Sequence, residues 1–142
     1  MAAFAKLLAV IPPFDANGVL PPGVHLATPA EVADRFGQSS ELRRVQMQSV
    51  EWMIDLARRA GVQRIVLNGS FVMDIIEPND VDCVLLIRSD FPKDSTAEKE
   101  LLDGLPFLEM KLVRQAEFEE YVNEIFGTDR SGVPKGVIEV IS

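Results

Sequence analysis

The chain has 142 residues, a length that fits one globular domain and excludes two full ones. Hydrophobic residues make up 47% and charged residues 25%, which allows a buried core and excludes a disordered tail or a fibre. The formal net charge is −8, with 14 Lys and Arg against 22 Asp and Glu. Such a charge repels a polyphosphate backbone, so bulk coating of DNA or RNA is excluded.

Cysteine and histidine usage limits the chemistry further. Cys83 is the only cysteine and His25 the only histidine, so neither an internal disulfide nor a zinc cluster with Cys/His spacing is available. The opening apolar run, Leu7–Ile11, is too short for a signal sequence or a membrane span. We therefore expect a protein of the reducing cytoplasm that does not enter membranes.

Proline and glycine dominate the first part of the chain. Between Ile11 and Thr28 they oppose both a helix and a central strand. These residues are Pro12, Pro13, Gly18, Pro21, Pro22 and Gly23. We interpret residues 1–28 as an extended arm, whose apolar side chains allow it to lie across the domain, and residues 29–142 as the core of a single domain.

Capping motifs and apolar periodicity predict four helices. Capping boxes begin at Thr28 and Ser95, and Gly61 is placed for a left-handed cap after the longest amphipathic stripe. On that longest helix, Trp52 is expected in the core and Arg43 on the solvated face. The predicted helices are Pro29–Phe36, Glu41–Ala60, the segment from Ser95 that ends at Gly104, and Glu117–Phe126.

Four further segments have the pattern of strands. Val81–Ile87 is a continuous apolar run after one acid pair, which is typical of a strand buried on both faces. The others are Val62–Leu67, Phe107–Val113 and Val137–Ile141. The order of elements predicts an α/β or α+β domain in which a small mixed β-sheet is flanked by helices.

The segment that carries chemistry is Gly69-Ser70, nine further residues, and then Asp80-Val81-Asp82. Because side chains alternate along a strand, we expect Asp80 and Asp82 to point to one face at the mouth of the strand. Two such carboxylates repel each other unless a cation lies between them, and hard oxygen ligands select Mg²⁺ or Mn²⁺. Magnesium is usually shared with substrate phosphates, so the expected ligand is a nucleoside triphosphate, approached by the backbone of Gly69 and the hydroxyl of Ser70.

Ordinary turn chemistry is the alternative for the same residues. Asn79 and Asp80 could satisfy local backbone donors at the entry to a strand, and Gly69-Ser70 could be a strand-to-helix turn. That account leaves Asp82 unexplained, because an acid is unusual on a strand buried on both faces. His25 is interpreted as a packed or surface histidine and Cys83 as an inert buried residue.

The spacing of Gly69, Ser70, Asp80 and Asp82 resembles the signature of the polymerase-beta-type nucleotidyltransferase superfamily. Over nearly the whole chain, the segments LPPGVH, NGSFV, PNDVD and DRSGVPKGVIEV are similar to small uncharacterised bacterial nucleotidyltransferase-like proteins. The superfamily core is a strand ending in Gly-Ser, a strand with the acid pair, and a strand with a third acid. The predicted elements follow the same order.

The resemblance implies a third acid, and the sequence leaves its identity open. Glu109 lies on the expected strand between two apolar residues, but the superfamily most often has aspartate there. Glu139 lies in the same local pattern and is the second candidate. A chain in which no third acid acts is the remaining alternative, and it would bind metal without turnover.

By the same resemblance, Asp80, Asp82 and Glu109 are the catalytic and metal-ligating residues. Asp80 and Asp82 would hold two Mg²⁺ ions that bridge the triphosphate, and Glu109 would help to activate an attacking hydroxyl. Lys111 and Lys135 are candidate phosphate-binding residues, because basic donors stabilise charge on the phosphates.

The resemblance thus implies a metal-dependent nucleotidyltransferase that transfers a nucleoside monophosphate to a protein or RNA acceptor. Similar minimal transferases act in bacterial toxin–antitoxin or phage-defence pairs, and the acidic surface favours a protein acceptor. Two alternatives stay open: a catalytically inactive interaction or regulatory module, in which the arm crosses to the second subunit of a homodimer, and a sensor that binds nucleotide and metal without transfer.

Overall fold

The structure is a computed structural model that describes residues 11–125, 132 and 134–142. The strands are β1 (Gly23–Ala27), β2 (Arg64–Asn68), β3 (Val81–Leu86), β4 (Leu108–Val113) and β5 (Gly136–Val140). The helices are α2 (Pro29–Phe36), α3 (Glu41–Ala60), α4 (Ser95–Asp103) and α5 (Gln115–Glu120). A short 3₁₀ turn, η1 (Ser70–Val72), follows β2, and a π-helical turn, η2 (Tyr121–Ile125), continues α5.

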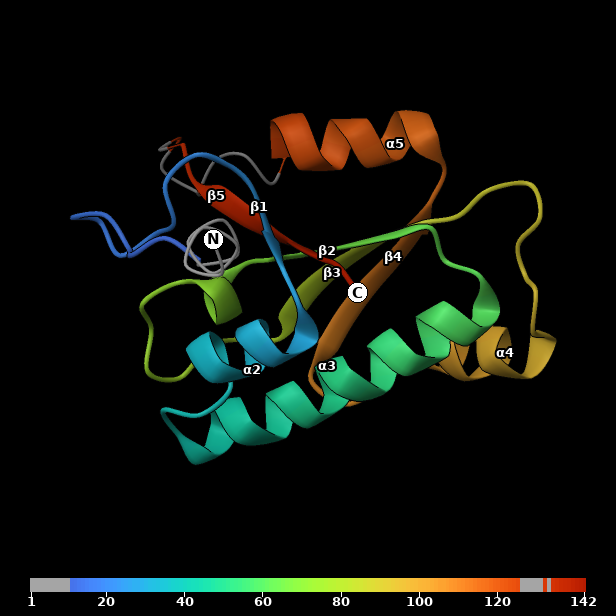
Figure 1. The fold of residues 1–142 in the computed structure, drawn as a ribbon, viewed down its shortest axis with the longest axis horizontal. Coiled ribbons are helices and arrows are strands. Elements are labelled where there is room, and N and C mark those ends of the chain that lie inside the picture. Colours follow the sequence, from blue (N-terminus) through green and yellow to red (C-terminus); the bar gives the residue numbers. More distant parts are fainter. Residues whose placement is uncertain (1–10, 126–131, 133) are drawn as a thin grey trace, which may run out of the picture.

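The five strands form one mixed sheet in the order β1-β5-β2-β3-β4. β3 and β4 are parallel, as are β1 and β5, whereas β2 is antiparallel to both of its neighbours. Helices α2, α3 and α4 lie on one side of this sheet and α5 lies on the other (Figure 1). The predicted architecture, a small mixed sheet flanked by helices, is therefore confirmed.

Each face of the sheet has its own hydrophobic core. Strand alternation places Val81 and Cys83 in the larger core beneath α3, and places Val84 and Leu86 in the smaller core beneath α5 with Phe118. β3 is buried on both faces, as its continuous apolar run predicts. Because Asp82 has the same parity as Val84, its side chain leaves the sheet on the α5 face, near the start of β3.

Local capping chemistry accounts for where the helices begin. Thr28 accepts from the backbone N–H of Glu31 and completes the predicted capping box of α2. Asp94, rather than Ser95, is the N-cap of α4, because its carboxylate accepts from the N–H groups of Thr96 and Ala97. α3 has the predicted bounds and ends at Gly61, whose φ of 91° is left-handed.

Two parts of the sequence interpretation change. Trp52 is 49% exposed on α3, so its expected place in the core is wrong. The end of the proline-rich arm forms the edge strand β1, which pairs with β5 and was not predicted; Val19 and Leu20, just before it, are buried. Residues 1–10 of the arm, and Phe126 of the predicted fourth helix, lie outside the described residues.

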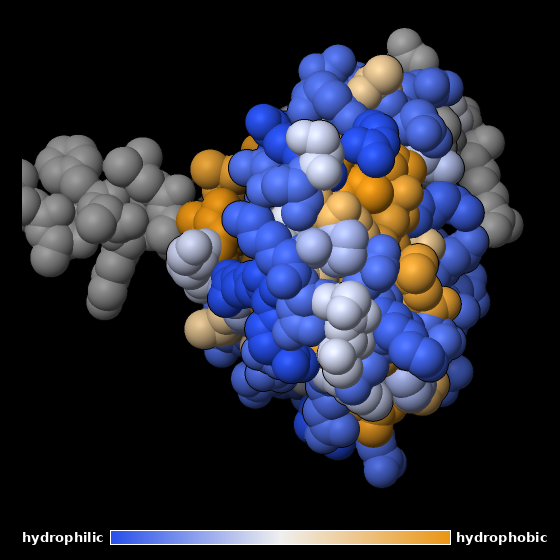
Figure 2. Space-filling view, turned by 90° about the vertical axis from the view of Figure 1, so that its right-hand side faces the viewer, coloured by the Kyte–Doolittle hydropathy of each residue, from blue (hydrophilic) through white to orange (hydrophobic). Residues whose placement is uncertain are grey.

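The side of the molecule on which α4 lies has a mainly hydrophilic surface with small hydrophobic groups among the polar ones (Figure 2). Within the described ranges, no helix combines the length and the apolar character that crossing a bilayer requires.

Candidate functional site

A cavity of about 750 Å³ opens at the end of the sheet where β2 ends and where β3 and β4 begin. Six of the seven predicted site residues line it: Gly69, Ser70, Asp80, Asp82, Glu109 and Lys135. They come from four segments of the chain and meet because the ends of neighbouring strands share one edge of the sheet. The cavity is therefore the place at which the sequence-based site converges.

Asp82 and Glu109 form the centre of the site. They are directly opposite each other in the register of the parallel strands β3 and β4, so their side chains leave the same face of the sheet. The pKa of Asp82 is raised to about 6, first by burial, then by the charge of Glu109 and a hydrogen bond with the Glu109 carboxyl. Lys135 opposes this shift and Asp80 adds slightly to it. The carboxyl of Asp82 thus holds a proton more readily than an isolated one.

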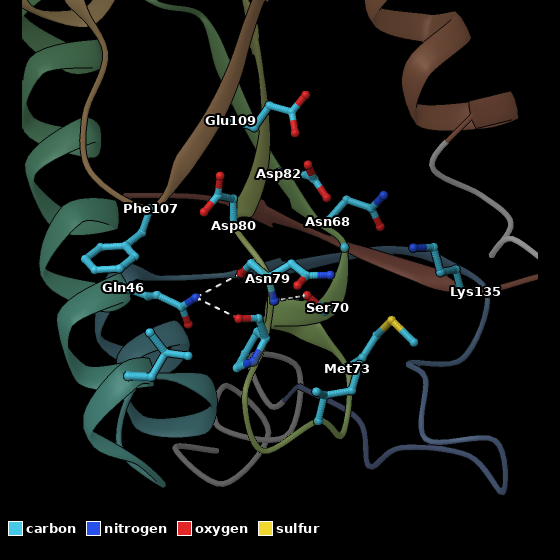
Figure 3. Close-up of a pocket in the computed structure, with 14 residues that line it drawn as sticks. Gln46, Asn68, Ser70, Met73, Asn79, Asp80, Asp82, Phe107, Glu109 and Lys135 are labelled. Carbon is cyan, nitrogen blue, oxygen red and sulfur yellow. Dashed lines mark hydrogen bonds between the residues drawn. The ribbon is translucent and has the colours of Figure 1, made fainter.

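Asp80 lies in the bend before β3, so the alternation of strand side chains does not extend to it. The carboxyl of Asp80 points to the side of Phe107, whereas that of Asp82 points to the side of Asn68 (Figure 3). The expectation that the two aspartates share a direction is therefore wrong, although both line the same cavity. Among the described residues, no three His, Cys, Asp or Glu side chains form a group arranged to hold a metal ion.

The Gly69-Ser70 pair has a definite structural role. Gly69 has a φ of 82°, and a Cβ at this position would overlap Oδ2 of Asp82, so glycine is what allows the carboxylate to lie against the turn. The hydroxyl of Ser70 accepts from the backbone N–H of Asn79 at 2.8 Å and closes the loop between them. This closure accounts for the nine-residue spacing and leaves the hydroxyl proton of Ser70 able to donate to a ligand.

Two side chains of α3 hold this loop in place. Arg43 is 3% exposed and donates to backbone carbonyls of the loop, among them Phe71 at 2.6 Å and Met73 at 2.8 Å. Gln46 donates to the carbonyl of Asn79 at 2.9 Å (Figure 3). The prediction that Arg43 faces solvent is wrong. The signal that places it inside is its spacing of four and seven residues from the buried Met47 and Val50.

Asn68, which the sequence analysis did not select, is 5% exposed and lies opposite Asp82 in the register of β2 and β3. Its carbonyl oxygen Oδ1 is buried without a hydrogen-bond partner. Lys135 also lines the cavity and is 7% exposed. The last residue of β2 and the residue before β5 thus add an amide and an ammonium group to the acid pair.

The remaining two candidates lie elsewhere. Lys111 is exposed opposite Val84, one strand repeat beyond Glu109, and does not line the cavity. Glu139 accepts from Nε and Nη2 of Arg64 at 2.8 and 2.6 Å and is absent from the cavity lining. Of the two alternatives for a third acid, only Glu109 is positioned beside Asp82.

The donor set fits a magnesium or manganese ion. Asp82 and Glu109 offer adjacent carboxylate oxygens whose mutual repulsion a divalent cation would relieve, and Asn68 offers an unpartnered carbonyl oxygen. Magnesium needs only one or two protein carboxylates when substrate phosphates complete its coordination, so an incomplete protein cage is compatible with such a site.

Comparison with known proteins gives a family and nothing more specific. No curated protein and no solved structure matches the chain. Residues 12–141 match a family of unknown function, DUF6932, and this range includes every residue that lines the cavity. The chain therefore belongs to the DUF6932 family.

Proposed function

We propose that the cavity binds a nucleoside triphosphate together with Mg²⁺ or Mn²⁺ and transfers its nucleoside monophosphate to a hydroxyl group of a protein or RNA. The observation that carries this proposal is the opposed pair Asp82 and Glu109, which shares one cavity with Asp80, the Gly69-Ser70 turn and Lys135. A metal-bound triphosphate requires carboxylate oxygens for the metal ion and positive or hydroxyl donors for the phosphates, and the acid pair, Lys135 and Ser70 supply these groups.

The charged and polar residues that line the cavity have separate roles in this scheme. Lys135 attracts the triphosphate, and the Ser70 hydroxyl donates to a phosphate oxygen. The carboxylate of Glu109 takes up the proton of the attacking hydroxyl, while Asp82 and Asn68 would hold the metal ion beside it. The metal, when bound, stabilises negative charge on the attacking and leaving oxygens as pyrophosphate departs.

The acceptor follows from charge. A chain with a net charge of −8 repels RNA at long range, so a protein acceptor is favoured over an RNA acceptor. A role in a toxin–antitoxin or phage-defence pair accords with the resemblance to minimal nucleotidyltransferases described above.

Binding is tested by calorimetric titration of the full chain with ATP, GTP, CTP and UTP in the presence of Mg²⁺. We expect at least one nucleotide to bind only when Mg²⁺ is present, and we expect Asp82→Asn and Glu109→Gln to abolish that binding. Lys135→Met removes the ammonium group from the cavity and should weaken the same binding. Two exposed positions outside the cavity give matched controls, Glu117→Gln for the carboxyl variants and Lys111→Met for Lys135→Met. Nucleotide binding that is equal in native chain and Asp82→Asn would refute the proposal.

Transfer is tested separately with a nucleoside triphosphate labelled on the α-phosphate, incubated with cell extract and the native chain or Asp82→Asn. Label on a macromolecule that appears only with the native chain, accompanied by release of pyrophosphate, is the expected result. Digestion of the product with protease or with ribonuclease then separates a protein acceptor from an RNA acceptor.

A catalytically inactive interaction or regulatory module of the same fold is the second candidate. The divergent carboxyls of Asp80 and Asp82 and the glutamate at the third acid position favour it, because two-metal chemistry needs converging ligands. This candidate predicts that label transfer and release of pyrophosphate are absent with the native chain as well as with Asp82→Asn.

A further inference from the structure

The two ends of the cavity differ. Asn68 and the ammonium group of Lys135 lie at one end, whereas the aromatic ring of Phe107 lies at the other, beside α3, with the amide of Gln46 (Figure 3). Leu42 and Pro78 also line the cavity and add to its apolar surface. A ligand that is anionic at one end and flat and apolar at the other would match both ends, and a nucleotide has that character.

Phe107 has an unusual backbone. Its φ is 66°, and among the described residues every other position with a positive φ is a glycine. It follows Pro106 in the turn that the N–H of Leu108 closes on the carbonyl of Leu105 at 3.3 Å, a position that favours glycine or asparagine. A bulky aromatic residue here is strained, and a glycine would satisfy the turn better.

Packing does not explain why phenylalanine occupies this position. Phe107 is 40% exposed, and neither hydrophobic core of the described residues includes it. Its carbonyl accepts from the N–H of Val81 at 2.7 Å, which ties Phe107 to the first residue of β3, between Asp80 and Asp82. The strained turn therefore presents an aromatic surface to the cavity at a fixed place beside the acids.

We propose that the ring of Phe107 is the surface on which the base of the bound nucleotide stacks, with the triphosphate extending toward Lys135. This inference rests on the proposed function and adds to it the position of the base. Stacking on an aromatic ring tolerates any base because each has a π face, and larger rings stack better. The site therefore accepts several nucleotides and binds purine nucleotides more tightly than pyrimidine nucleotides.

The sharpest test compares Phe107→Tyr with Phe107→Leu in the full chain. Both variants keep a bulky side chain on the left-handed backbone, and only the tyrosine keeps an aromatic ring. Titration with ATP and Mg²⁺ is expected to show an affinity within about twofold of the native chain for tyrosine and at least about fivefold weaker for leucine. Inorganic tripolyphosphate, which has no base, should bind all three proteins equally.

Two further variants exclude a merely structural role. Phe107→Gly relieves the left-handed strain, so it should fold at least as readily as Phe107→Leu and still bind ATP weakly. Phe107→Trp combined with Trp52→Phe leaves one tryptophan, at the proposed stacking surface. Its fluorescence should be quenched by ATP but not by tripolyphosphate.

The outcomes separate this inference from the function on which it rests. If native chain and Phe107→Leu bind ATP equally, or if leucine weakens ATP and tripolyphosphate to the same extent, the stacking role is overturned while triphosphate binding stands. If the native chain binds neither ATP nor tripolyphosphate with Mg²⁺, both proposals fail. The native chain is therefore titrated before any variant.

Discussion

Two glutamates on the same face of the sheet have opposite surroundings. Glu139 of β5 is held by Arg64 through two hydrogen bonds, and the Arg64 guanidinium also lies over the ring of Phe118 at 4.8 Å. Glu109 of β4 lies opposite another acid, Asp82, whose pKa it raises. One glutamate is neutralised within the fold, whereas the other adds negative charge to a cavity.

The difference separates a structural charge from a ligand-binding charge. A partly buried carboxylate with a bidentate arginine stabilises the smaller core and has little capacity left for a ligand. Two adjacent carboxyls at a cavity store repulsion that a bound cation removes. Both glutamates lie between apolar neighbours in the sequence, so the residue across the strand pair, rather than the local pattern, decides which role each has.

The largest effect is expected from Gly69→Ala, which disturbs the surroundings of the Asp82–Glu109 pair. Alanine at a φ of 82° costs about 1–3 kcal/mol, and its Cβ would also push the Asp82 carboxylate away from the turn. Urea unfolding should show a loss beyond that range together with loss of Mg²⁺-dependent nucleotide binding.

Gly104→Ala is the matched control for this variant. Gly104 has a φ of 90°, but a Cβ there would meet no atom within 4 Å, so only the backbone cost remains. If the two alanine variants lose the same stability and both bind nucleotide, the close approach of Asp82 to Gly69 has no consequence.

The variant Arg64→Met breaks the Arg64–Glu139 ion pair, because it keeps an apolar side chain and removes the charge. Because Glu139 would stay partly buried without its partner, we expect the free energy of unfolding to fall by about 2 kcal/mol. Adding Glu139→Leu should recover part of the loss in a double-mutant cycle, whereas combining Arg64→Met with Glu109→Gln should give additive effects. A non-additive effect of Arg64→Met and Glu109→Gln on the free energy of unfolding would contradict the separate roles of Glu139 and Glu109.

Much of the fold is predictable because its signals are local. The bounds of α3 follow from Ser40, which caps its first turn, from Gly61 at its end, and from the periodicity between them. β1 escaped prediction because its partner is β5, more than 100 residues further along the chain, and prolines hide its pattern. Trp52 was misplaced because a helical stripe does not tell how far the neighbouring layer extends.

The site residues show the same difference between local signals, which the sequence contains, and long-range contacts, which it does not. Gly69, Ser70, Asp80 and Asp82 were predictable as one group because a short loop, closed by Ser70 on Asn79, brings them together. Phe107 and Arg43 were missed because their roles depend on a turn conformation and on carbonyls that only the folded chain presents. Lys111 and Lys135 look equivalent in sequence, and only strand register separates the exposed lysine from the cavity lysine.

The smallest effect is expected in the melting temperature of Asp82→Asn as a function of pH. This measurement compares the Asp82–Glu109 pair with the Arg64–Glu139 pair most directly. The pKa of Asp82 is about 6 in the folded chain and near 4 when unfolded, so folding favours its protonated form. The stability that this group contributes is fully present below about pH 4 and is lost as the pH rises through 6. Asparagine avoids the loss, so its melting temperature should match that of the native chain at pH 4 and exceed it by a few degrees at pH 7.5.

Glu139→Gln should show the opposite sign at pH 7.5, because it removes a charge that Arg64 stabilises. Addition of Mg²⁺ at this pH should raise the melting temperature of the native chain and leave Asp82→Asn unchanged, since a bound cation compensates the same repulsion that asparagine removes. A difference between Asp82→Asn and the native chain that is constant from pH 4 to 7.5 would show that neither burial nor the charge of Glu109 raises the pKa of Asp82. The contrast with the Arg64–Glu139 pair would then have no electrostatic basis.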